Sequence, residues 1–88
     1  KRKRESTHTF YVYILQCEDG SYYTGYTSNL ISRFVQHKKG SGARYTRLRR
    51  PKKIIYVEKF GTRSAAMRRE RQIKCLTHDQ KREFLRKT

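Results

Sequence analysis

The sequence predicts one small α/β domain, built from a β-hairpin, a helix, a third strand and one or two further helices. Two runs rich in aromatic and β-branched residues, 10–15 and 22–27, flank a Glu-Asp-Gly-Ser turn, as in a hairpin. A third such run covers 53–60, and the segments after the second and third runs have apolar residues at helical spacing. The chain has 88 residues, enough for a single core. We therefore expect one domain over 9–88, preceded by a basic, disordered tail over 1–8.

The hairpin is predicted from its two strands and from the turn chemistry between them. The first run, Phe10-Tyr11-Val12-Tyr13-Ile14-Leu15, has no polar face and predicts a strand that is buried on both sides. The turn at 18–21 contains Gly20, which can adopt positive φ. The returning strand contains Gly25, and glycine inside a strand indicates a bulge or a close approach of the backbone to a ligand.

A helix is predicted from about Asn29 to Lys38, with Ser28 as its N-cap. Arg33 and His37 lie one turn apart, at the edge of its apolar stripe. The following segment, 39–51, is basic and contains two glycines, so we expect an irregular loop. It is interpreted either as a solvated loop or as a nucleic-acid contact, whose residues would be Arg44, Tyr45, Arg47, Arg49 and Arg50.

The second long helix is predicted from about Arg63 to Leu76, capped by Thr62. Ala66, Glu70 and Ile73 share one face of it, so Glu70 is a carboxylate in an apolar stripe. Such a group must be paired, protonated or bound to a metal ion, and an ion pair with an arginine is the structural alternative. A short terminal helix is expected over 78–87.

Charge and cysteine content restrict the partners and the compartment. Lys and Arg total 23 against 7 acidic residues, a formal net charge of +16, which favours nucleic acid as the partner. An anionic membrane is the competing partner, but no long apolar run is present to anchor the chain. Cys17 and Cys75 lack metal-site spacing and are expected to be reduced, half-buried thiols. We therefore expect an intracellular protein, in the cytoplasm and nucleoid or in a nucleus.

Residues from about 10 to 76 contain a set of motifs whose order along the chain resembles that of the GIY-YIG nuclease domain. Tyr11-Val12-Tyr13 matches the first motif, with Tyr and Val in place of Gly and Ile, and Tyr23-Thr24-Gly25 matches the second. The helix with Arg33 and His37 matches the family's helix, and Glu70 falls at the family's metal-binding glutamate. The chain is similar to small stand-alone bacterial proteins of the UPF0213 type. It is also similar to the nuclease subunit of a eukaryotic complex that cuts branched DNA.

The resemblance implies a three-stranded antiparallel sheet flanked by helices, an α+β arrangement, and a nuclease that depends on Mg²⁺ or Mn²⁺. It implies that Glu70 binds the metal and that Arg33 stabilises the scissile phosphate. Tyr13 is the first candidate for general base, with His37 orienting it or accepting its proton, and Tyr23 is the second. A phenol is a poor base unless positive neighbours such as Arg33 lower its pKa. Taken alone, each tyrosine would be assigned to core packing.

The expected function is therefore an endonuclease that hydrolyses phosphodiester bonds. By resemblance DNA is favoured over RNA, and branched DNA and repair or recombination intermediates are candidate substrates. A protein partner is a candidate source of specificity. The alternative is a basic nucleic-acid-binding module with little or no catalytic activity. A ribosome-associated or RNA-structure protein also fits the composition, but leaves the tyrosines and Glu70 unexplained.

Overall fold

A computed structural model describes residues 9–88, and the predicted basic tail over 1–8 lies outside the described residues. The described elements follow the predicted order of strands, with one additional short helix. They are β1 (Phe10–Cys17), β2 (Tyr22–Thr27), α1 (Leu30–Lys38), α2 (Arg44–Arg49), β3 (Pro51–Phe60), α3 (Arg63–Lys74) and α4 (His78–Lys87). The three strands form one antiparallel sheet in the order β2-β1-β3. The fold predicted with the family resemblance, an α+β domain with a three-stranded antiparallel sheet, is confirmed.

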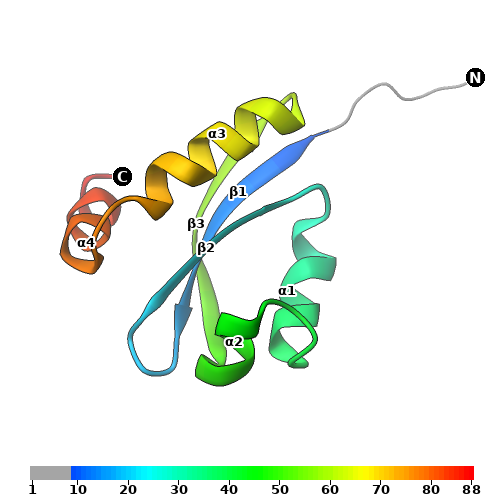
Figure 1. Cartoon of the computed structure of the whole chain (residues 1–88), viewed down its shortest axis with the longest axis vertical. Helices are drawn as coiled ribbons and strands as arrows, with labels where there is room; N and C mark the ends of the chain where they lie inside the picture. Colours follow the sequence, from blue (N-terminus) through cyan, green and yellow to red (C-terminus); the bar gives the residue numbers. More distant parts are fainter. Residues whose placement is uncertain (1–8) are drawn as a thin grey trace, which may run out of the picture.

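Helices cover both faces of the sheet, and β1 lies at its centre (Figure 1). Helix α3 packs on one face, and α1 and α2 lie on the other. Successive side chains of a strand point to opposite faces, so β1 supplies two different layers. Val12 and Ile14 point towards α3, whereas Tyr13 points towards α1 and forms a hydrogen bond with it. The prediction that this strand is buried on both faces is correct.

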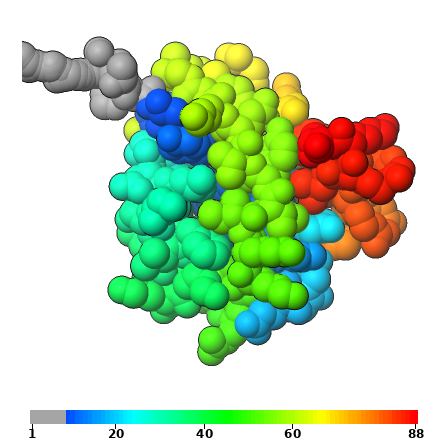
Figure 2. All heavy atoms as spheres, turned by 180° about the vertical axis from the view of Figure 1, so that it is seen from behind, coloured from blue at the N-terminus to red at the C-terminus, as the bar shows by residue number. Residues whose placement is uncertain are grey.

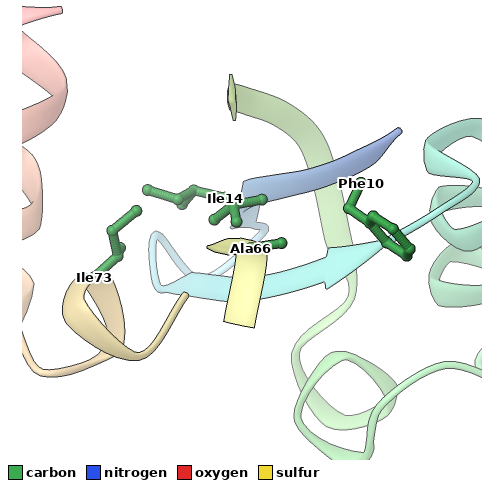
Figure 3. Packing of buried hydrophobic residues seen from close by; sticks show 5 residues of the cluster. Phe10, Ile14, Ala66 and Ile73 are labelled. Atoms are coloured by element: carbon green, nitrogen blue, oxygen red, sulfur yellow. The ribbon is translucent and has the colours of Figure 1, made fainter. Parts of the chain in front are cut away.

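The apolar core lies between β1 and α3. Its buried members are Phe10, Val12, Ile14, Ala66 and Ile73. Figure 3 shows the side chains of Ile14, Ala66 and Ile73 gathered between the sheet and α3. Burying aliphatic side chains of this size contributes roughly 1.5–3 kcal/mol each, so this layer is the main apolar source of stability.

Helix α4 projects from the side of the molecule, as the space-filling view shows (Figure 2). The ring of Phe84 meets Tyr56 of β3 edge to face at 5.1 Å. Arg69 of α3 lies over the same Phe84 ring and donates a hydrogen bond of 2.9 Å to Glu58. These contacts attach α4 to the core through β3 and α3. Within residues 9–88, no helix is both long enough and apolar enough to cross a membrane.

Several local predictions need correction. Asn29, not Ser28, caps α1, because its side chain accepts a hydrogen bond from the backbone N–H of Ser32. The predicted cap Thr62 is correct, since it accepts from the N–H of Ala65. Cys17 is buried and Cys75 is exposed, so neither thiol is half-buried as predicted.

The segment 39–51 is not an irregular loop throughout, because it contains α2 and the first residue of β3. Helix α2 has only six residues and lacks the apolar periodicity by which helices are recognised in a sequence. It is stabilised instead by a buried polar residue, Thr46, which is 1% exposed.

Candidate active site

A buried hydrogen-bonded pair forms the centre of the site. Tyr13 extends from β1, and its hydroxyl oxygen lies 2.9 Å from Nε2 of His37, in the last turn of α1. Tyr13 is 1% exposed and His37 is fully buried. Two elements distant in the sequence thus hold a phenol and an imidazole together, away from bulk water.

The hydrogen bonds of His37 continue into α2. Its second ring nitrogen, Nδ1, lies 2.7 Å from Oγ1 of Thr46. Thr46 in turn donates a hydrogen bond of 2.9 Å to the backbone carbonyl of Ala43. Both ring nitrogens therefore have a partner, as expected for a buried imidazole.

The environment keeps both groups of the pair neutral. Burial, together with the neighbouring phenol of Tyr23, raises the pKa of Tyr13 to about 12. Burial, reinforced by the positive charge of Arg33, lowers the pKa of His37 to about 4. Arg33 also acts to lower the pKa of Tyr13, as predicted, but burial outweighs it. At neutral pH the pair is a phenol beside an imidazole that can accept a proton.

Tyr23 of β2 lies beside this pair. Its ring centroid is 5.1 Å from that of His37 and 6.3 Å from that of Tyr13. The ring centroid of Tyr45, on α2, lies 5.9 Å from that of Tyr23, and the guanidinium of Arg49 lies 4.8 Å from the centroid of the Tyr45 ring. A row of aromatic rings thus connects the buried pair with the basic surface of α2.

Two glycines allow the rings to sit this close to the backbone. A Cβ atom added to Gly25 would lie 2.6 Å from the Tyr13 hydroxyl, and one added to Gly42 would overlap Nδ1 of His37. The close approach predicted at Gly25 is therefore to Tyr13 itself, and the strand pairing through Gly25 is regular. The role of Gly42 and that of Thr46 were not predicted from the sequence. The segment 42–46 is part of the resemblance to the small stand-alone proteins, but that resemblance does not assign a role to either residue.

Arg33 lies on α1, one turn before His37, and is half-buried. Its Nη1 donates a hydrogen bond of 3.0 Å to Oε1 of Gln36. Its positive charge acts on the pKa values of both Tyr13 and His37, lowering each of them.

Glu70 belongs to the other layer, so the predicted grouping of Glu70 with Tyr13, Arg33 and His37 stays a prediction. Glu70 lies on α3, on the face of the sheet opposite to α1 and α2, yet its negative charge contributes to the raised pKa of Tyr13. Its side chain is 18% exposed, and one carboxylate oxygen is 3.4 Å from Nζ of Lys74. The ion pair considered from the sequence is therefore present, with a lysine in place of an arginine.

The donor set indicates which metal ions would suit this site. Within residues 9–88, no group of three or more His, Cys, Asp or Glu side chains is placed to hold a metal ion together. Zinc in structural sites requires four such ligands, so that type of site does not fit. Mg²⁺ retains several waters and uses one or two carboxylates together with substrate phosphates. A single, mostly buried carboxylate such as Glu70 fits that requirement.

The basic residues expected to contact nucleic acid lie at the surface of α2 and just after it. Arg44, Arg47, Arg49 and Arg50 are all exposed. A hollow of about 140 Å³ lies behind His37 and Thr46, and Lys38, Lys39, Arg47 and Arg50 contribute to its wall. Arg49 differs from the others, because its Nε lies 3.8 Å from a carboxylate oxygen of Asp19. Three of the four arginines are thus the better candidates for phosphate contacts.

Comparison with known proteins relates this geometry to a family. The sequence model of one protein family, the GIY-YIG catalytic domain, matches residues 9–83 of this chain. A UPF0213 protein of Staphylococcus haemolyticus is 51% identical over 71 residues, which is 81% of this chain and 87% of the relative.

Two solution NMR structures are similar to the structure of this chain. One is a UPF0213 protein of Bacillus halodurans, with a TM-score of 0.57 and 42% identity, covering 88% of this chain and 82% of that one. The other is a protein of E. faecalis, with a TM-score of 0.62 and 40% identity, covering 99% of this chain and 90% of that one. The matched domain includes all the site residues described above, and the chain belongs to the GIY-YIG catalytic domain family.

Proposed function

We propose that this protein is a metal-dependent endonuclease that hydrolyses phosphodiester bonds in nucleic acid, with DNA as the favoured substrate. The observation that carries the proposal is the buried pair of Tyr13 and His37, which joins a phenol to a neutral imidazole beside Arg33. Buried titratable groups with strongly shifted pKa values cluster at functional sites, which favours catalysis over binding alone. Membership of a family of catalytic domains supports the same function.

In the proposed reaction Tyr13 activates the attacking water. The water gives a proton to the Tyr13 oxygen while Tyr13 passes its own proton to Nε2 of His37, 2.9 Å away. The water oxygen forms a bond to phosphorus, the bond from phosphorus to the leaving oxygen breaks, and the leaving oxygen takes the electron pair and then a proton from solvent. His37, whose pKa is about 4, then releases the proton it received to solvent, which restores the neutral pair. With a pKa near 12, Tyr13 does not rest as a phenolate, so it needs this transfer to His37.

Arg33 and Glu70 supply the charges of the site. The Arg33 guanidinium would bind the scissile phosphate and stabilise the additional negative charge of the transition state. Glu70 would hold Mg²⁺ or Mn²⁺, and the ion would supply positive charge at the phosphate and at the leaving oxygen. An ion held by Glu70 would compete with Lys74, whose half-exposed side chain lies 3.4 Å from one of the carboxylate oxygens.

The surface of α2 supports a nucleic-acid substrate. Arg44, Arg47 and Arg50 are exposed, and the net charge of +16 favours a polyanion over other ligands. Tyr45 lies between this surface and Tyr23, so a bound strand would be guided towards the buried pair. Branched DNA and repair or recombination intermediates are the substrates that we would examine first, with a protein partner as a candidate source of specificity.

The alternative is a basic nucleic-acid-binding module with little catalytic activity. Incubation of purified protein with matched linear and branched DNA, in Mg²⁺, Mn²⁺ or EDTA, separates the two functions. Cleavage that occurs with either metal ion and stops in EDTA is the expected result. Binding of both substrates without cleavage under any of these conditions would support the binding module and contradict the proposal.

A further inference from the structure

We infer that Thr46 is a positioning residue, which fixes His37 in the tautomer that carries its hydrogen on Nδ1. In that tautomer Nε2 has a free lone pair directed at the Tyr13 hydroxyl. The role of this tautomer in catalysis rests on the proposed function, whereas the tautomer itself follows from the hydrogen bonds alone. Thr46 touches neither the substrate nor the reacting atoms in this account, and it acts only through the imidazole.

The inference follows from the direction of two hydrogen bonds. A threonine hydroxyl has a single hydrogen to donate, whereas a backbone carbonyl can only accept. Thr46 lies 2.9 Å from the carbonyl oxygen of Ala43, so its hydrogen is used in that bond. Its oxygen must then accept from the second neighbour, Nδ1 of His37, at 2.7 Å. Nδ1 therefore carries a hydrogen.

The remaining nitrogen has its role set as a consequence. The low pKa of His37, about 4, means that the ring carries one hydrogen at neutral pH, and that hydrogen is on Nδ1. Nε2 is therefore an acceptor, and the hydroxyl of Tyr13, 2.9 Å away, is the donor. The chain of hydrogen bonds has one direction throughout, from Tyr13 through His37 and Thr46 to the carbonyl of Ala43.

The opposite tautomer would block the proposed transfer. With hydrogen on Nε2, the imidazole would donate to the Tyr13 oxygen and could not accept its proton. Nδ1 would then need a donor, which Thr46 could supply only by giving up its bond to Ala43. That change would leave the two oxygen atoms, 2.9 Å apart, without a hydrogen between them. Protonation of Nε2 during the reaction does not disturb the bond from Nδ1 to Thr46, so the support stays in place.

Packing holds the ring and the hydroxyl in this geometry. Thr46 is 1% exposed and His37 is fully buried, so bulk water has little access to these bonds. The backbone at Gly42 passes so close to Nδ1 that a side chain there would overlap the imidazole. Helix α2 thus holds the Thr46 hydroxyl in a fixed position next to the imidazole of His37.

The test compares Thr46→Val, which removes the hydroxyl at nearly constant volume, with Thr46→Ser, which keeps it. Long-range ¹H–¹⁵N NMR at neutral pH reports which ring nitrogen of His37 carries the hydrogen. Wild-type protein and Thr46→Ser should show hydrogen on Nδ1. In Thr46→Val the ratio of the Nδ1-H tautomer to the Nε2-H tautomer should fall roughly tenfold, the effect of one hydrogen bond. Single-turnover DNA cleavage should fall in parallel for Thr46→Val and be largely retained in Thr46→Ser.

The two readouts separate this inference from the proposed function. Hydrogen on Nε2 in wild-type protein would overturn the inference whether or not DNA is cleaved, and this result needs no variant to fold. An unchanged tautomer and cleavage rate in Thr46→Val would overturn it as well. Hydrogen on Nδ1 in a protein that cleaves no nucleic acid would support the tautomer assignment and contradict the proposed function.

Discussion

The two faces of β1 are built by different kinds of interaction. On one face Val12 and Ile14 pack against α3 in a layer of aliphatic contacts. On the other face Tyr13, between them in the sequence, enters a polar layer with His37 and Thr46. The side chains of both layers are almost fully buried, since these five are at most 1% exposed.

The difference lies in how precisely each layer must be specified. Aliphatic contacts have no direction, so the α3 layer requires volume and burial but tolerates changes of identity. Hydrogen bonds have donors and acceptors, so the α1–α2 layer requires a particular atom at each point. Stability and catalysis should therefore respond separately to substitutions at neighbouring positions of one strand.

The largest effect is expected for Tyr13→Phe, which removes one oxygen atom and keeps the ring. Single-turnover cleavage should fall about 10²- to 10⁴-fold, the usual contribution of a general base. Folding should be retained at a cost of about 1–3 kcal/mol, because Nε2 of His37 loses its donor. Rates measured with protein in excess of DNA, together with circular dichroism, check both parts. A rate within threefold of wild type would show that Tyr13 serves packing alone.

The substitution Ile14→Ala, on the α3 face of β1, is the counterpart of Tyr13→Phe. Ile14 is fully buried in the α3 layer, so we expect a loss of about 2–5 kcal/mol in the free energy of unfolding. The rate per folded molecule should stay near that of wild type, because Ile14 does not touch the polar layer. Denaturant titration gives the first quantity and active-site-normalised kinetics the second. A large loss of rate in folded protein would mean that the two layers are coupled.

The pH dependence of stability should identify His37 in the polar layer. Its pKa is about 4 in the folded protein against an ordinary 6.5, so between these values the unfolded chain binds a proton that the folded chain does not. Stability should accordingly fall as pH decreases from 6.5 to 4, by about 3 kcal/mol in total.

His37→Gln removes this group, so the variant should lose less stability than wild type over the same pH range. Denaturant unfolding at pH 7.5, 5.5 and 4 measures the difference. If the free energy of unfolding fell equally with pH in the two proteins, His37 would not be a buried, neutral group.

The smallest effects are expected at the exposed surface of α2. Neutralising Arg44 and Arg47 with glutamine should reduce DNA affinity for all sequences about equally, and flatten the salt dependence by roughly 0.9 in log–log slope per lost contact. Turnover of bound DNA should change little. Arg82 and Arg86 on α4 are the matched control, because each pairs with an acidic residue of its own helix. Equal effects at both surfaces would indicate that binding depends only on net charge.

The apolar layer and the order of elements could be predicted from the sequence. Tyr11-Val12-Tyr13 and the spacing of Ala66 and Ile73 are local patterns, and local patterns specify strands and amphipathic helices. The candidate residues Tyr13, Tyr23 and His37 also lie together, although they come from three separate elements. Their motifs, recognised as a set, carried information that no single residue has.

The polar support of the site could not be predicted in the same way. Thr46 lies on a helix too short to have an apolar stripe, and Gly42 resembles an ordinary loop glycine. Both residues matter because they lie next to Nδ1 of His37, which is nine residues before Thr46 and five before Gly42. That proximity is a property of the tertiary structure. Burial likewise reversed the expected net shift of the Tyr13 pKa, and burial of a particular hydroxyl is not visible in a residue pattern.

The most direct test of the proposed active site compares Glu70→Gln with Glu58→Gln in Mg²⁺-dependent cleavage. Both substitutions remove one carboxylate charge from a half-buried, ion-paired side chain on the α3 side of the sheet, but only Glu70 is assigned to the metal ion. With protein in excess over DNA, Glu70→Gln should lose Mg²⁺-dependent cleavage while it still binds DNA, and Glu58→Gln should cleave at nearly the wild-type rate. Full Mg²⁺-dependent activity in Glu70→Gln would contradict the assignment of the metal to Glu70 and, with it, the proposed active site.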